Sequence, residues 1–255
     1  MMNLAILIRA ELTEAGKDYK YVWLTIFFIL LGFTQPLINM YLDIILQQLG
    51  GTIGVILDPN KPPPTSSEIF LSTVSGQFNQ IGLIILIISF MGLITTDRQS
   101  GMQDFILTRP VSIYSYVHAK LIAHWLISMF SIFFGILASY LYTVYLFGSF
   151  PFLKLLSFSI LYSLWILYLV SLVLVISVYI KQQILIAVLT IGVAFFLLVI
   201  KGLSPTFLYF LPSSILDVAT HQISGTHDVH NSSVVCCLLI TVAHLIWASK
   251  KLKQH

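Results

Sequence analysis

The sequence predicts an all-α integral membrane protein with six transmembrane helices. Of its 255 residues, 58% are hydrophobic and only 9% are charged, and the mean hydropathy is +0.94. Soluble domains carry about 25% charged residues, so most of this surface must face lipid. Six apolar runs are long enough to cross a bilayer as helices, and no stretch alternates at the strand period long enough to indicate a barrel.

The six predicted spans are strongly apolar and almost free of charge. They cover about residues 21–42, 78–96, 121–147, 155–180, 183–200 and 233–249, within a single membrane domain of residues 1–255. Lipid offers the backbone no hydrogen-bond partner, so each span is expected to be a helix. Cys236 and Cys237 are adjacent in the last span, and neighbouring cysteines in a helix indicate no disulfide framework.

Residues 3–17 precede the first span and mix apolar with charged side chains. The apolar ones are Leu4, Leu7, Ile8, Leu12 and Ala15, and the charged ones are Arg9, Glu11, Glu14 and Lys17. This pattern predicts an amphipathic helix in the inner membrane interface, with a cytoplasmic extension of the first span as the alternative. The charges follow the short apolar run and no small-residue cleavage site appears, so a signal peptide is not expected.

The lysines and arginines predict that both termini are cytoplasmic in a multi-pass protein of the cell membrane. Ten of the 13 then lie inside: Arg9, Lys17, Lys20, Arg98, Arg109, Lys120, Lys181, Lys250, Lys251 and Lys253. Outside are Lys61, Lys154 and Lys201. This bias follows the positive-inside rule and places segment 97–120, between spans two and three, in the cytoplasm.

Motifs that carry chemistry are missing from the sequence. It contains no G-x-x-x-x-G-K-[ST] phosphate-binding loop, no H-E-x-x-H, no C-x-x-C and no G-x-S-x-G. The ionisable residues inside the predicted spans are His124 and His244, both near inner ends, with no carboxylate pair at mid-membrane. The sequence therefore predicts a non-catalytic membrane subunit without a cofactor of its own and without a nucleic-acid partner.

Two sets of polar residues inside the spans could pack helices together or line a path. In span three these are His124, Ser128, Ser131, Gly135, Ser139 and Tyr142, at spacings that place all six on one helical face. In span one, Gln35 and Asn39 flank Pro36, which should kink or break the helix. A structural kink is expected there, with a gating hinge as the sharper alternative.

The segment HQISGTHDVHN offers a weaker candidate, a metal site in an outer loop. His221, His227, Asp228 and His230 are of the residue types that bind zinc or copper. Their spacing is not specific, so we expect no metal, and a solvated loop is the favoured interpretation.

The segment DRQSGMQDFILTRPVSIYSYVHAK, residues 97–120, resembles the cytoplasmic loop between spans two and three of ABC type-2 (ABC-2 family) transporter permeases. The matching positions are Asp97, Arg98, Gly101, Arg109, Pro110, Val111, Ser112, Tyr116 and Lys120. Asp97, Met102 and Ile113 depart from the residues commonest in that family. The resemblance implies a bacterial transporter built from two permease subunits, identical or paralogous, and two separate subunits that bind ATP and Mg²⁺.

The same segment has the pattern of a coupling helix that contacts the ATP-binding subunit. Residues 99–108 are expected to form it, with Met102, Phe105 and Ile106 as its apolar face and Pro110 as its end. Arg98 and Arg109 flank it and could pair with acidic partner residues. A helix resting on the bilayer is the alternative. The predicted coupling residues are Asp97, Arg98, Gly101, Met102, Phe105, Ile106, Arg109, Pro110 and Ser112.

These observations predict an ATP-driven exporter of a hydrophobic drug, an antimicrobial peptide or a lipid-like molecule. A passive channel or ion-coupled carrier is one alternative, although it would place more charge at mid-membrane. A membrane protein for peptide immunity or sensing is another, and its outer loops 43–76 and 201–232 would then hold the specificity.

Overall fold

The computed structural model describes residues 2–48, 64–102, 112–201, 210–225 and 232–253. At residues 2–3 and 42–48 only the course of the backbone is described. Every regular element in these ranges is helical, and six helical stretches are long and apolar enough to cross a membrane. Among the described residues, the predicted all-α class and the number of spans are confirmed.

Two helices form the amino-terminal part. Helix α1 covers Met2–Lys17, and α2 covers Lys20–Gln48. Tyr19 separates them with a φ of 55°, so α1 is not a simple extension of the first span. Helix α2 runs unbroken through Pro36, so of the predicted kink or break the break does not occur. One lost hydrogen bond is evidently tolerated in a helix supported by its neighbours.

The second span is longer than predicted and is irregular. It comprises α3 (Ser66–Ser72), the π-helix η1 (Thr73–Gly82), α4 (Leu83–Phe90) and α5 (Thr95–Gln99). A capping box of Thr65 and Glu68 starts it twelve residues before the predicted start at 78. The polar segment TVSGQFNQIG lowers the local hydropathy and conceals this helical start.

The remaining spans are regular. They are α7 (Ile113–Phe147), α8 (Phe152–Tyr179), α9 (Gln183–Lys201) and α11 (Ser232–Leu252). The short η3 (Pro212–Ser214) and α10 (Ile215–Ser224) lie between the last two.

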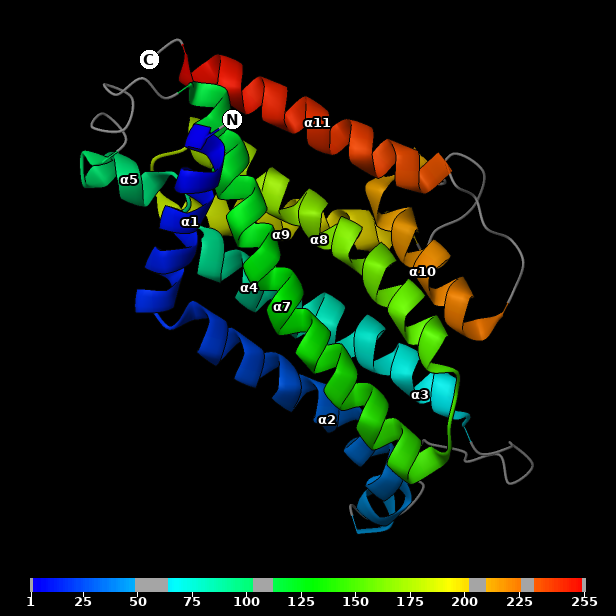
Figure 1. Cartoon of the computed structure of the whole chain (residues 1–255). Coiled ribbons are helices and arrows are strands. Elements are labelled where there is room, and N and C mark those ends of the chain that lie inside the picture. The colour runs from blue at the N-terminus through cyan, green and yellow to red at the C-terminus, as the bar shows by residue number, and fades with distance from the viewer. Residues whose placement is uncertain (1, 49–63, 103–111, 202–209, 226–231, 254–255) are drawn as a thin grey trace.

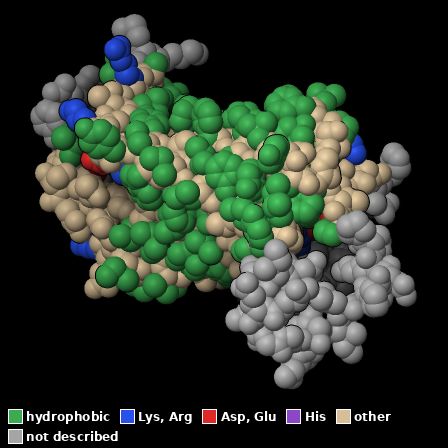
Figure 2. All heavy atoms as spheres, turned by 90° about the horizontal axis from the view of Figure 1, so that it is seen from below, with side chains coloured by type: hydrophobic (Ala, Val, Ile, Leu, Met, Phe, Trp, Pro, Cys, Tyr) green, Lys and Arg blue, Asp and Glu red, His purple; other side chains and the backbone are tan. Residues whose placement is uncertain are grey.

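Helix α8 lies at the centre of the bundle. In its most apolar stretch 72% of the residues are buried, against 22% in α9 and 28% in α2. Helix α8 packs against α7, α10 and α11, while α7 also carries α1 and α2 (Figure 1). Figure 2 shows apolar side chains across the middle of one face and charged ones towards its ends.

Both chain ends lie at the same end of the bundle as α5 (Figure 1). The amino terminus of α7 begins there too, and α7 ends at the opposite end of the bundle. The structure thus gathers α1, α5 and the start of α7 at one end of the bundle.

Candidate functional site: a buried ion cluster beside the 97–112 loop

Lys120 connects three segments that are far apart in the sequence. Its Nζ lies 2.8 Å from Oε1 of Glu11 in α1 and 2.9 Å from Oδ2 of Asp97 in α5. The Tyr116 hydroxyl, one turn before Lys120 in α7, donates to the same Asp97 oxygen at 2.7 Å. We call Glu11, Asp97, Tyr116 and Lys120 the ion cluster.

The ion cluster is withdrawn from solvent. The side chain of Lys120 is 3% exposed, that of Asp97 is 9% exposed and that of Glu11 is 14% exposed. Buried charges are costly unless they are paired and hydrogen-bonded, and each member has such a partner. Losing one partner should therefore destabilise the site far more than losing a surface ion pair.

The ion cluster holds more negative than positive charge. Two carboxylates share one ammonium group, so full ionisation leaves one net negative charge. Burial, reinforced by the nearby Asp97 and Glu14 carboxylates and opposed by Lys120, raises the pKa of Glu11 above its ordinary value. Neutralising Glu11 would leave the balanced pair of Lys120 and Asp97.

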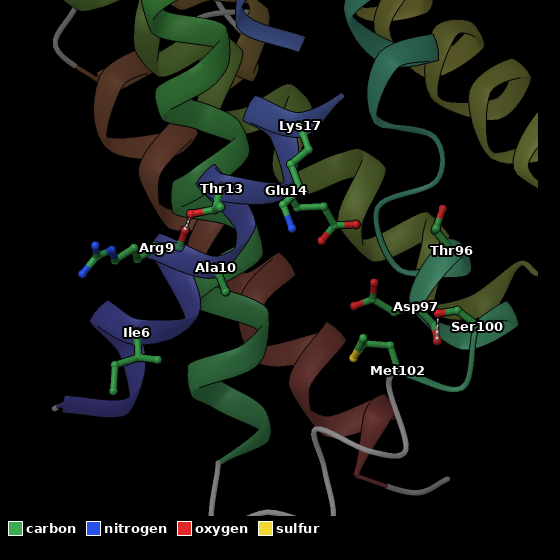
Figure 3. Close-up of a pocket in the computed structure, with 10 residues that line it drawn as sticks. All are labelled: Ile6, Arg9, Ala10, Thr13, Glu14, Lys17, Thr96, Asp97, Ser100 and Met102. Atoms are coloured by element: carbon green, nitrogen blue, oxygen red, sulfur yellow. Dashed lines mark hydrogen bonds between the residues drawn. The ribbon is translucent and has the colours of Figure 1, made fainter. Parts of the chain in front are cut away.

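Two cavities flank the ion cluster between α1 and the end of the second span. The larger has a volume of about 740 Å³ and is lined by Ile6, Arg9, Ala10, Thr13, Glu14, Lys17, Thr96, Asp97, Ser100 and Met102. Glu14 and Asp97 point into it from opposite walls, while the Arg9 guanidinium extends away from Asp97 (Figure 3). The smaller, about 130 Å³, reaches from Glu11 to His124.

Two other predicted coupling residues, Arg98 and Ser112, make contacts within the chain. Arg98 donates from Nη2 to the Val178 carbonyl at 3.2 Å, which satisfies a free carbonyl at the carboxyl end of α8. This contact within the chain was not predicted from the sequence, and the pairing of Arg98 with a partner stays a prediction. Ser112 caps α7 by accepting from the Ser115 N–H at 3.0 Å.

The start of the predicted coupling helix differs from the expectation. Helix α5 ends at Gln99, Ser100 and Gly101 form a turn with Gly101 at a φ of 72°, and Met102 is again helical. Met102 is half-exposed and lines the larger cavity. Phe105, Ile106, Arg109 and Pro110 lie outside the described residues.

The polar stripe of the third span faces α2. His124, Ser128, Ser131, Gly135 and Ser139 are buried, and Tyr142 is half-buried with its ring 5.2 Å from that of Phe33. Thr25 of α2 donates to the Ser131 hydroxyl at 3.2 Å. Of the two interpretations left open by the sequence, this geometry favours a seam of packed helices.

A second group of polar side chains lies where α2 meets η1. Gln77 of η1 donates to the Gln35 side chain of α2 at 3.3 Å, and both are half-buried. Asn39 is half-buried, and Gln80 is exposed. We call Gln35, Asn39, Gln77 and Gln80 the amide patch. Amides at this depth of an apolar span are costly in lipid unless something polar covers them.

Three of the four predicted metal candidates lie outside the described residues. No group of three or more His, Cys, Asp or Glu side chains that could hold a metal occurs among the described residues. His221 lies in α10, whereas His227, Asp228 and His230 are outside the described part of the chain.

Comparison with known proteins gives one relative and no family. No family model matches the chain. It is 26% identical over 260 residues, the full length of both proteins, to an uncharacterized transmembrane protein, YxlG, of Bacillus subtilis (strain 168). Together with the six apolar helices, this supports one assignment. The chain is a multi-pass membrane protein.

Sequence reasoning matched Asp97, Tyr116 and Lys120 to one loop but did not connect them with Glu11. A signal for that contact was present. Leu4, Leu7, Ile8, Glu11 and Ala15 follow one another at helical spacing, so Glu11 stands within the apolar face of α1. A carboxylate in such a face requires a buried cation, and Lys120 meets that need.

Proposed function

We propose that this chain is the membrane-spanning permease subunit of an ATP-driven ABC transporter. A separate subunit would bind and hydrolyse ATP with Mg²⁺, and a second copy or paralogue of the chain would complete the path through the cell membrane. The cargo class that best suits so apolar a chain is a hydrophobic drug, an antimicrobial peptide or a lipid-like molecule, moved outward.

The observation that carries the proposal is the anchoring of the loop between Asp97 and Ser112. The residues at its two ends make defined contacts, through the ion cluster and Arg98 on one side and the Ser112 cap on the other. These flanking residues, in α5 and at the start of α7, lie at the same end of the bundle (Figure 1). A partner that pushed on it would act directly on the second span and on α7.

The amide patch supports the second part of the proposal. Gln35, Gln77 and Gln80 are unsuited to lipid, and a facing permease subunit or a hydrated path would cover them. Gln35 and Asn39 follow Phe28 and Gly32 at helical spacing, so the patch continues, farther along α2, the face that these two residues present to α7.

The experiment is co-purification of the tagged chain with the ATP-binding subunit encoded beside it, followed by ATPase assay. We expect Phe105→Asp and Arg109→Glu to abolish co-purification and the stimulation of ATPase activity. Phe152→Asp is the matched control, because Phe152 is an exposed phenylalanine at the opposite end of the bundle. Normal complexes in both loop variants would refute the coupling role.

Transport itself needs a separate measurement. Proteoliposomes containing the complex should accumulate a fluorescent hydrophobic drug only with ATP, and Gln77→Leu together with Gln80→Leu should lower the rate without preventing assembly. Uptake that is indifferent to ATP would indicate a channel or an ion-coupled carrier instead.

A further inference from the structure

The junction between α1 and α2 has the geometry of a hinge. Asp18 and Tyr19 separate the two helices, and Tyr19 has a φ of 55° although its side chain is 70% exposed. A left-handed conformation costs a bulky residue roughly 1–2 kcal/mol. Such strain persists only where the surroundings impose it, so something must hold α1 in place.

Contacts along α1 show what holds it. Its apolar side packs on α7 through residues such as Ala15, which is buried, and the Tyr21 hydroxyl of α2 donates to the Leu12 carbonyl at 2.7 Å. Farther from the hinge, Glu11 of α1 forms an ion pair with Lys120 of α7 at 2.8 Å. Through Lys120 that contact continues to Asp97.

The space around this contact is not filled. The cavities of about 740 Å³ and about 130 Å³ lie between α1 and the end of the second span, with Glu14 and Asp97 on their walls. Figure 3 shows this hollow between α1 and the segment of Asp97 and Met102. The ion cluster therefore bridges a hollow between α1 and α5.

We propose that α1 is a hinged arm that turns about Tyr19, and that Lys120 is the latch that fastens it to the second and third spans. With Lys120 bound to both carboxylates, α1, α5 and the start of α7 move as one body. When the latch opens, α1 can turn away from α7 while the spans remain folded. This property belongs to the chain itself and does not rest on the proposed function.

The charges explain why the lysine and not a carboxylate is the latch. Removing Lys120 leaves Glu11 and Asp97 buried near each other without a cation, so they repel. Removing the charge of Glu11 instead leaves Lys120 paired with Asp97, and a glutamine there can still hydrogen-bond. Lys120→Met should therefore release α1, whereas Glu11→Gln should not.

A cysteine-labelling experiment on the full chain in detergent tests this. Cys236 and Cys237 are replaced by serine, and a reporter is added at Ala15→Cys in α1 or at Ala123→Cys in α7. Both alanines are buried, at 3% and 0% exposure. We expect Lys120→Met to speed maleimide labelling at Ala15→Cys by about tenfold or more, as loss of a buried ion partner predicts. Labelling at Ala123→Cys should not change.

A rescue variant separates the electrostatic latch from simple loss of the lysine side chain. Adding Glu11→Gln to Lys120→Met removes the repulsion between the carboxylates but does not restore the packing of the lysine side chain. The labelling rate at Ala15→Cys should therefore fall back towards that of the parent. An unchanged rate in Lys120→Met, equal acceleration at Ala123→Cys, or no rescue would each overturn the latch. No ATPase is present in this assay, so its result is independent of the proposed transport.

Discussion

Gly32 of α2 and Gly135 of α7 lie in direct backbone contact. A Cβ on Gly32 would stand 2.5 Å from the Gly135 carbonyl oxygen, and a Cβ on Gly135 would stand 2.7 Å from the Phe28 carbonyl oxygen. Backbone atoms cannot move aside as a flexible side chain can. The approach of these two helices therefore depends on glycine at both positions, as is common for helices packed in membranes.

Gly135→Ala should separate α2 from α7 and destabilise the fold by about 1–3 kcal/mol, the usual cost of overpacking. The thermal unfolding midpoint in detergent measures this. Gly192→Ala is the matched control, because nothing lies within 4 Å of the added methyl group and alanine favours the helix by about 1 kcal/mol. The seam is not as tight as described if both substitutions shift the midpoint in the same direction.

This seam shows what the sequence could and could not predict. The spacing from His124 to Tyr142 placed the six residues on one face, because helical periodicity is a local property. It did not say that the face meets Gly32 and Thr25, since their contact joins segments about a hundred residues apart. Packing and path-lining use the same small and hydroxyl residues, so only the three-dimensional arrangement favours one of them.

Lys120→Met should be among the most destabilising single substitutions in the chain. It leaves Glu11 and Asp97 buried without their cation, which costs about 3–5 kcal/mol. Lys20→Met is the control, because the ion pair of Lys20 with Asp18 is partly exposed and is worth at most about 1 kcal/mol. The same thermal unfolding assay compares them, and similar losses in both would show that the cluster is not effectively buried.

Glu11→Gln should gain stability relative to the parent as the pH rises. The pKa of Glu11 is raised by burial, so its stabilising contribution is full below about pH 4.5 and is lost as the pH rises through the raised pKa. Glutamine does not titrate, so the midpoint of the variant minus that of the parent should increase as the pH rises above about 4.5.

The other groups that face this site are the same in both proteins. Glu14, Asp18, Lys20, Asp97, Lys120 and His124 line the smaller cavity. Their titration therefore largely cancels in the difference between variant and parent. A difference that instead decreases with rising pH would mean that Lys120 outweighs burial and lowers the pKa of Glu11.

The ion cluster was only partly predictable for a physical reason. The resemblance matched the residues of one loop, and Asp97, Tyr116 and Lys120 do meet. Their fourth partner comes from α1, whose position on α7 depends on the turn at Tyr19. No common turn signal marks that turn, because tyrosine rarely adopts a positive φ. The contact of Arg98 with the end of α8 was not predicted either, since Val178 is eighty residues away.

Tyr19→Gly should raise the stability of the fold, whereas Tyr19→Val should lower it. Glycine adopts the φ of 55° without the penalty of roughly 1–2 kcal/mol that other residues pay, although its greater freedom in the unfolded chain offsets part of the gain. Valine is branched at Cβ and suits this conformation least. The Tyr19 side chain is 70% exposed, so little burial is lost in either variant.

Thermal unfolding midpoints in detergent give the ranking. Tyr145→Val is the control for loss of a surface ring, because the Tyr145 side chain is 82% exposed. Equal midpoints for the glycine and valine variants would show that the junction carries no strain and would contradict the hinge at Tyr19.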